Sequence, residues 1–223
     1  ENIWMSIWET NVYAKGRQLN RYPYDTVVSD VFRWSSGRDR SQLRVLEVGS
    51  GSGNNLWFLA REGFQCAGID ISETAVECAK KYLAGDNLEA DIQVGDIVDL
   101  PWERGSFDLV IDRIAITHNT QSEIERMHDE VVRVLRPGGE FVSVMLAWDH
   151  PAHRTGVELS HHAFNHFSDP VFSEAGLTFF ADREDIYHLF EKSFDRFECK
   201  KIVNLSEEDQ VMNAMWHVHA WLQ

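Results

Sequence analysis

The stretch Leu43-Arg-Val-Leu-Glu-Val-Gly-Ser-Gly-Ser-Gly53 decides how the rest of the chain folds. Its apolar residues Val45, Leu46 and Val48 predict a strand buried in a parallel sheet. Three glycines at alternate positions follow, and residues 54–60 have the pattern of a helix. Glycines let the backbone turn tightly and approach a ligand closely. The stretch therefore predicts the first half of a nucleotide-binding βαβ unit.

Strands and helices continue to alternate after this unit. Gly63 predicts the end of the first helix, Ser72 the N-cap of the next, and Thr120 with Glu123 a capping box. Asp182 predicts the cap of a last helix. We expect further strands at residues 65–70, 91–96, 107–112, 140–146, 197–205 and 212–222. The last two strands have no helix between them. The predicted fold is therefore α/β, a three-layer sandwich around a seven-stranded, mostly parallel, doubly wound sheet with a C-terminal antiparallel hairpin.

We interpret the whole chain, residues 1–223, as a single domain, since it has no repeat, low-complexity segment or linker. Residues 1–40 predict a helical lid region, in which Trp4, Trp8 and Tyr13 have roughly helical spacing. These rings are either core anchors or parts of a lid, for which Tyr13 is the best candidate. Residues 148–180 are expected to form an irregular insertion on the substrate side.

Composition excludes several classes of partner. The formal net charge of −15 disfavours nucleic acid and anionic membranes, because both are bound by clustered Lys and Arg. The three cysteines are far apart and have no metal-ligand or redox spacing. No stretch of 18 apolar residues exists. We therefore expect a cytoplasmic protein, a monomer or homodimer, that binds a small molecule and neither nucleic acid nor membrane.

The glycine pattern narrows the choice of nucleotide. A dinucleotide fold has G-x-G-x-x-G, whereas here the glycines follow G-x-G-x-G and Asn54 stands where the third glycine would fall. A P-loop is excluded because no Gly-Lys-Ser/Thr follows. Glu47 precedes the glycines, and its carboxylate would repel a pyrophosphate but attract an ammonium group.

Five ordered segments carry a resemblance to a known family. They are Glu47–Gly53, Gly68-Ile-Asp70-Ile-Ser72, Gly95-Asp96-Ile97, Phe107-Asp-Leu-Val-Ile-Asp112 and Leu135-Arg-Pro-Gly-Gly139. Over about residues 40–147, the chain resembles the class I, Rossmann-like S-adenosylmethionine-dependent methyltransferases of the small-molecule type. The resemblance implies S-adenosyl-L-methionine as cofactor and S-adenosyl-L-homocysteine as product.

The resemblance also implies roles for individual residues. Glu47 and the glycine-loop backbone would hold the methionyl end, and Asp70 would accept hydrogen bonds from the ribose hydroxyls. Asp96 would accept from the adenine amino group, beside the Ile97 amide. For Asp70 and Asp96, a helix cap or a solvated turn is the alternative. The expected cofactor-binding residues are Tyr13, Glu47, Gly49, Ser50, Gly51, Gly53, Asn54, Asp70, Ile71, Asp96, Ile97, Asp112 and Arg113.

The acceptor is less well defined than the cofactor. Family members that methylate ring or amide nitrogens carry Asn/Asp-Pro-Pro-Tyr/Phe after the fourth strand, which here reads Asp112-Arg-Ile-Ala-Ile-Thr-His118. We expect transfer to an oxygen or nitrogen of a small molecule, and a weaker likeness in residues 8–25 suggests a sugar or another biosynthetic intermediate. His118 and His150 are the candidate catalytic bases, because both follow strand ends and histidine titrates near neutrality.

Other interpretations remain open from sequence alone. His150 with His153, and His162 with His166, have metal-ligand spacings, but hard metals prefer carboxylates to a histidine cluster, and we expect no metal. The chain could also be a catalytically silent S-adenosylmethionine-binding module that regulates a partner. A nicotinamide-dependent oxidoreductase is disfavoured by the shifted glycines.

Overall fold

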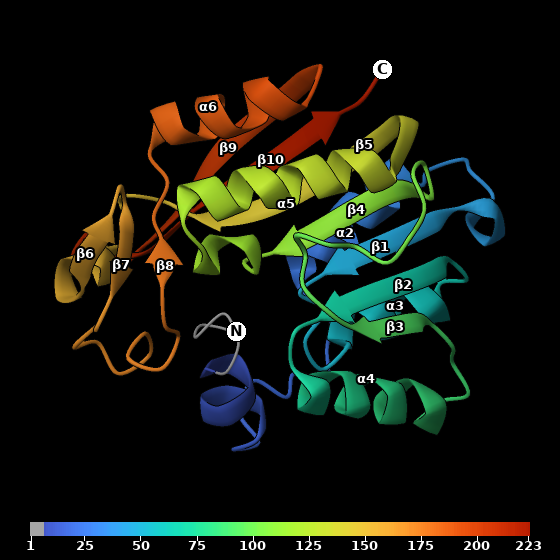
Figure 1. Cartoon of the computed structure of the whole chain (residues 1–223), viewed down its shortest axis with the longest axis horizontal. Coiled ribbons are helices and arrows are strands. Elements are labelled where there is room, and N and C mark those ends of the chain that lie inside the picture. Colours follow the sequence, from blue (N-terminus) through green and yellow to red (C-terminus); the bar gives the residue numbers. More distant parts are fainter. Residues whose placement is uncertain (1–6) are drawn as a thin grey trace.

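A seven-stranded sheet forms the centre of the protein, with the strand order β3-β2-β1-β4-β5-β10-β9 (Figure 1). The computed structural model describes residues 7–223. The helix predicted around Trp4 therefore lies outside the described residues. Strands β3 to β5 in this order are parallel, and β10 is antiparallel to both β5 and β9. The strands are β1 (Arg44–Val48), β2 (Gln65–Asp70), β3 (Asp91–Val94), β4 (Phe107–Arg113), β5 (Leu135–Leu146), β9 (Arg196–Leu205) and β10 (Val211–Trp221). The predicted sheet and its C-terminal hairpin are confirmed.

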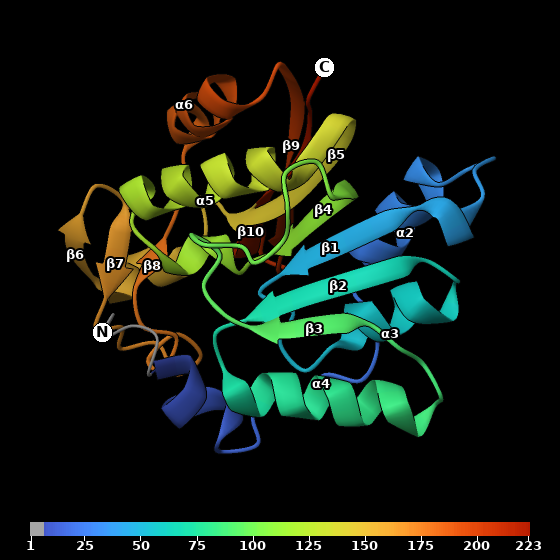
Figure 2. The ribbon, with the colours of Figure 1, turned by 45° about the vertical axis from the view of Figure 1, so that its right-hand side comes forward.

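Helices cover both faces of the sheet, which gives the predicted three layers (Figures 1 and 2). On one face, α5 (Gln121–Val134) and α6 (Arg183–Ser193) bury apolar side chains against the sheet. On the other face, α2 (Asp25–Trp34), α3 (Asn54–Arg61) and α4 (Glu73–Gly85) do the same. Within residues 7–223, no helix is long and apolar enough to cross a lipid bilayer.

The predicted caps are present. The Ser72 hydroxyl accepts a hydrogen bond from the Ala75 amide at 3.0 Å, which begins α4. Thr120 and Asp182 each form a capping box with the residue three positions on, at the starts of α5 and α6. Short polar side chains thus satisfy helix N–H groups that have no partner within the helix.

Two expected strand boundaries differ from the structure by more than one residue. Helix α5 ends at Val134 and β5 begins at once with Leu135, five residues before the expected strand. The reason is pairing, since Leu135 already lies opposite Phe107 of β4 before the register shifts. Strand β3 ends at Val94, so Asp96 lies beyond it.

The insertion after β5 is more ordered than expected. It contains a small antiparallel sheet of β6 (Val157–Ser160), β7 (Ala163–Asn165) and β8 (Thr178–Phe179), beside α6 in Figures 1 and 2. The alternation in residues 157–165 is too short to stand out from a loop. Short helical segments complete the chain: η1 (Trp8–Tyr13), η2 (Arg40–Gln42), η3 (Ile116–His118) and η4 (Pro151–Thr155).

Candidate functional site

A cavity of about 370 Å³ opens at the carboxyl ends of β1, β2 and β4. In open α/β sheets this edge, outside the strand ends, is where ligands bind. The N-terminal segment reaches this edge of the sheet. Trp8 and Tyr13 line the cavity, and the Glu9 carboxylate of η1 accepts hydrogen bonds from Ser72 and Thr74 at the start of α4. Twelve of the expected site residues line the cavity: Tyr13, Glu47, Gly49, Ser50, Gly51, Asn54, Asp70, Ile71, Asp96, Ile97, Arg113 and His118. Gly53, Asp112 and His150 are not among its lining residues.

The glycine loop is shaped by two close approaches. Gly51 has a φ of +51°, and a side chain there would place a Cβ atom 2.6 Å from the Tyr13 hydroxyl. Gly53 has a φ of +82°, and its Cβ would lie 2.7 Å from the Cβ of Ala79 in α4. Both φ values are costly for residues with a side chain. Gly51 thus lets Tyr13 close on the loop, whereas Gly53 packs helix against helix outside the cavity.

Glu47 is a buried carboxylate with only half of its hydrogen bonds made. Its side chain is 2% exposed, and Oε1 accepts a hydrogen bond from Asn55 Nδ2 at 2.6 Å. Oε2 has no partner within residues 7–223. Burial, with the nearby charges of Asp70 and Asp112, raises the pKa of Glu47 to about 8. A cationic ligand in the cavity would pair with the free oxygen and favour the ionised form.

Asp70 holds the glycine loop in place. Its two oxygens accept hydrogen bonds from the Gly51 amide at 2.8 Å and the Ser72 amide at 2.9 Å. Burial raises the pKa of Asp70 above its usual value. The carboxylate still lines the cavity, so its remaining lone pairs can accept hydrogen bonds from a ligand.

Asp96 and Ile97 lie just past the end of β3 and line the same cavity. Asp96 Oδ1 accepts from the Val98 amide at 3.2 Å, a local turn contact of the kind expected from the alternative interpretation. Ile97 is 9% exposed, and with Ile71 it offers an apolar wall for a flat ring. Asp96 and Ile97 can therefore bind the edge of a nucleobase, while Asp96 also holds the turn after β3.

Within residues 7–223, Arg113 supplies the one guanidinium group among the cavity-lining residues. Its guanidinium carbon lies 4.5 Å from the centre of the Tyr24 ring, and its Nε has no partner in the described chain. Burial lowers the pKa of Arg113. Arg113 and Glu47 thus line one cavity, and each has one buried polar atom without a partner within residues 7–223.

Asp112, the neighbour of Arg113, is saturated by the protein itself. It is fully buried and accepts hydrogen bonds from the Ala115 and Ile116 amides and the Ser143 hydroxyl. The expected ligand role therefore does not fit its position. Asp112 instead fixes the turn after β4 that brings Arg113 and η3 to the cavity.

His118 is the only histidine that lines the cavity within residues 7–223. Its Nδ1 lies 3.2 Å from Thr178 Oγ1, and its ring packs against Trp8 with 4.8 Å between ring centres. The ring also hydrogen-bonds the backbone of Leu177, and the Thr178 hydroxyl has a second partner in the Gly176 carbonyl at 3.4 Å. With the proton on Nδ1, Nε2 would keep a lone pair. Burial lowers the pKa of His118 to about 4, which keeps the ring neutral near pH 7.

His150 lies elsewhere in the insertion. It is 8% exposed, its Nδ1 accepts from the Ala152 amide at 3.1 Å, and its ring packs on Phe172 and Phe180. It therefore caps η4 rather than reaching the cavity. The sequence placed it correctly after β5, but the insertion turns its ring away.

Sequence reasoning missed three groups that support or line the site. Asn55 holds Glu47, and its place in the first turn of α3 was visible in the sequence. Thr178 orients His118 from 60 residues away, and nothing local marks it. Trp8 was expected among the aromatic residues of the lid region, but not as the neighbour of His118.

Comparisons with known proteins show what the chain is similar to. Residues 45–139 match the family model described as Methyltransferase domain. The match identifies residues 45–139 as a methyltransferase domain, and the chain as a whole has the fold of solved S-adenosylmethionine-dependent methyltransferases. The chain is 34% identical to norajmaline N-methyltransferase of Rauvolfia serpentina over 106 residues, which are 46% of this chain and 36% of that protein.

Solved structures show the same fold over nearly the whole chain. An S-adenosylmethionine-dependent methyltransferase from Methanosarcina mazei matches with a TM-score of 0.69 and 20% identity, covering 90% of this chain and 99% of that one. Phosphoethanolamine N-methyltransferase 2 of Haemonchus contortus, in complex with phosphomonomethylethanolamine and S-adenosylhomocysteine, matches with a TM-score of 0.68 and 17% identity, covering 98% and 57%. The chain spans little more than a third of the length of the first curated relatives it matches.

Proposed function

We propose that this protein transfers a methyl group from S-adenosylmethionine to an oxygen or nitrogen atom of a small molecule. The observation that carries the proposal is that Glu47 and Arg113 line one cavity beside the glycine loop, and that each has a buried polar atom, Oε2 and Nε, without a partner in the described chain. Buried polar atoms without a partner are rare in folded proteins and call for an explanation. An α-amino acid group, with one ammonium and one carboxylate, explains both.

The rest of the cavity fits the rest of the cofactor. Asp70 has acceptor capacity left for hydroxyl groups, and the apolar Ile71 and Ile97 with the carboxylate of Asp96 suit an aminopurine ring. When bound, S-adenosylmethionine supplies a methyl group on a positively charged sulfur. The chain then has to orient the acceptor and take up its proton.

We infer that His118 accepts that proton through Nε2. This requires the tautomer with the ring proton on Nδ1, which faces Thr178 Oγ1. A pKa of about 4 makes His118 a weak base. Such a base suffices when the acceptor proton becomes strongly acidic only as the new bond to carbon forms.

A hydroxylated acceptor, such as a sugar, suits the outer part of the site. A second cavity of about 340 Å³ adjoins the first and shares Trp8, Gln18 and Asn20 with it. An indole face and side-chain amides offer an apolar surface and hydrogen bonds to hydroxyl groups. Arg17 and Glu174, which form an ion pair, close its rim.

Two experiments test the proposal. Calorimetry should show binding of S-adenosylhomocysteine and no comparable binding of NAD. A screen of sugars, nucleotide sugars, amines and phenols, read as release of S-adenosylhomocysteine, should then find an acceptor whose turnover is lost in His118→Ala. Tight binding of NAD without a response to S-adenosylhomocysteine would overturn the proposal. Cofactor binding with no turnover across a broad panel would favour the silent binding module.

A further inference from the structure

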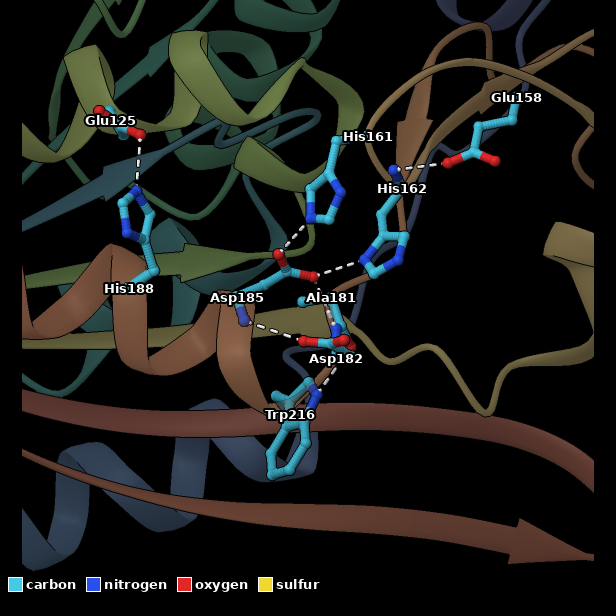
Figure 3. Close-up of polar contacts among 9 residues, drawn as sticks. All are labelled: Glu125, Glu158, His161, His162, Ala181, Asp182, Asp185, His188 and Trp216. Carbon is cyan, nitrogen blue, oxygen red and sulfur yellow. Dashed lines mark hydrogen bonds and ion pairs between the residues drawn. The ribbon is translucent and has the colours of Figure 1, made fainter.

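A second constellation of titratable side chains lies outside the cavity. Two adjacent histidines in the turn between β6 and β7 direct their rings at one carboxylate in the first turn of α6 (Figure 3). His161 Nε2 lies 2.7 Å from Asp185 Oδ1, and His162 Nδ1 lies 2.7 Å from Asp185 Oδ2. The two rings are stacked with 4.0 Å between their centres. Three potential metal ligands thus converge on one point.

The turn adopts a strained backbone to place His162 there. His161 and His162 alone connect Ser160 of β6 to its partner Ala163 of β7. His162 has a φ of +50°, the left-handed region that Gly or Asn usually occupies in two-residue turns. Its amide donates to Glu158 Oε1 at 2.9 Å, which holds the turn. Strained backbone held by its surroundings is concentrated at functional sites.

Asp185 is a fixed, ionised ligand. It is 4% exposed and belongs to the capping box of α6, in which it exchanges hydrogen bonds with Asp182. Burial alone would raise the pKa of Asp185. The hydrogen bonds from the Asp182 amide and from the two histidines outweigh burial and lower this pKa. In the described part of the chain, no Lys or Arg forms an ion pair with it. The acidic first turn of α6, which includes Glu184, offsets the positive end of the helix dipole.

We propose that His161, His162 and Asp185 bind a divalent transition-metal ion of the zinc class. One atom from each lies within 4.8 Å of the other two, so a small shift brings all three to one ion. Two imidazoles and a carboxylate form a ligand set typical of Zn²⁺, with a further position open to water. On binding, His161 Nε2 and His162 Nδ1, which now face Asp185, would coordinate the metal instead. Each ring would then carry its proton on the other nitrogen, Nδ1 of His161 and Nε2 of His162.

A second histidine cluster in the chain does not fit a metal in the same way. Asp30, His217 and His219 also lie close together, between α2 and β10. However, Arg33 lies 3.5 Å from Asp30, and His219 is already paired with Glu140. That cluster is a compensated ion network, and a further cation would compete with Arg33.

A metal at the first cluster would tie the small sheet to α6. The same sheet includes β8, whose Thr178 contacts His118 in the cavity. The ion would thus fix the insertion at a point outside the methyl-transfer site. Binding can be measured without any acceptor or cofactor, so its failure would leave the proposed methyl transfer intact.

The test is titration of the full, chelator-treated chain with Zn²⁺ in a calorimeter. His161→Ala removes one ligand, and His188→Ala is the matched control. The two rings are 56% and 55% exposed, and each bonds a carboxylate oxygen through Nε2, at 2.7 Å to Asp185 and 3.1 Å to Glu125. We expect one ion per wild-type chain, affinity at least about tenfold weaker in His161→Ala, and no change in His188→Ala.

Absorption of bound Co²⁺ gives an independent readout of the ligands. The wild type and His188→Ala should show the intense visible bands of a four-coordinate Co²⁺ ion, and His161→Ala should lose them. Binding of Zn²⁺ should also raise the melting temperature of the wild type. The proposal is overturned if Zn²⁺ does not saturate at one ion per chain. Equal weakening by the two substitutions would equally overturn it, because it would indicate scattered binding by surface histidines.

Discussion

Replacing Glu47 by Gln should stabilise the ligand-free protein while it weakens cofactor binding. Burial is the main cause that raises the pKa of Glu47 from 4.5 to about 8. Because the folded-state pKa lies above the unfolded-state value, the native state loses stability as the pH rises from 4.5 through 8. At pH 7 this loss is about 3 kcal/mol by linkage. Gln cannot ionise, and it can keep the hydrogen bond from Asn55.

The stability gained in Glu47→Gln should be smaller than the roughly 3 kcal/mol that ionisation costs the wild type at pH 7. The amide nitrogen of Gln would occupy the place of Oε2, which has no partner in the described chain, and an unsatisfied buried donor costs about 1–2 kcal/mol. We therefore expect the free energy of unfolding at pH 7 to rise by roughly 1–2 kcal/mol. For a chain of this size, each kcal/mol raises the melting temperature by about 2–4 °C.

Binding of S-adenosylhomocysteine should change in the opposite direction. Only the ionised form of Glu47 pairs with an ammonium, so below pH 8 the wild type must release a proton on binding. Its affinity should rise about ninefold from pH 6 to pH 7. Glu47→Gln should remove that dependence and lose about 1.5–3 kcal/mol of binding free energy, the contribution of a hydrogen bond to a charged group.

Calorimetry at the two pH values, in buffers with different heats of ionisation, measures affinity and proton release together. Asp112→Asn is the matched control. It also removes a buried carboxylate, but one that is satisfied by three donors and lies outside the cavity lining. It should still release a proton on binding, and its pH dependence should remain but lie at lower pH, because the charge of Asp112 no longer raises the pKa of Glu47. A Glu47→Gln protein that melts lower, or that binds as tightly as the wild type with the same pH dependence, would refute the reasoning.

Three further predictions concern the cavity and the far face of the sheet. Asp70→Ala should weaken binding of S-adenosylhomocysteine by about 1–3 kcal/mol in calorimetry, and unchanged affinity would remove Asp70 from the site. Once an acceptor is identified, His118→Ala should lower kcat about 10²–10⁴-fold. Thr178→Val should lower kcat by a smaller factor and leave KM unchanged. The kcat of the wild type should fall only near pH 4–5, where His118 becomes protonated. Wild-type kcat in both variants would make this pair structural. Burial lowers the pKa of His219, but hydrogen bonds to Asp30 and Glu140 raise it further, to about 9. The stabilisation that protonated His219 gives the fold is therefore complete below pH 6.5 and is lost as the pH rises through 9. Denaturant titration should therefore show His219→Gln less stable by about 1–2 kcal/mol at pH 7 and nearly equal to the wild type at pH 10.

The parts of the fold and site that could be predicted are those set by local sequence. The strand at residues 44–48 and the glycine turn after it depend on neighbouring residues, and so do the caps at Ser72, Thr120 and Asp182. Asp70 and Asp96 could be placed together because the carboxyl ends of parallel strands share one edge of the sheet. Their convergence needed the topology but no knowledge of side-chain packing.

The parts that could not be predicted depend on contacts between distant segments. Thr178 meets His118 only because the insertion folds back as a small sheet, and β8 is two residues long. His150 follows a strand end as expected, yet aromatic packing on Phe172 and Phe180 turns it from the cavity. The spacing of His162 and His166 suggested one pair of ligands, whereas the turn pairs His162 with Asp185, 23 residues away.

Hydrogen bonding separates the carboxylates that serve the fold from those available to a ligand. Asp112 and Glu47 are both buried near the same strand ends, and sequence reasoning gave both a place at the cofactor. Asp112 accepts three hydrogen bonds from the protein, so a ligand could gain little from it. Glu47 accepts one, and its unpaired oxygen makes the ionised form of this buried carboxyl unfavourable without a ligand. A bound cation would remove the cost of this buried, unpaired charge. The affinity for a cationic ligand and the lower stability of the ligand-free protein therefore have the same source.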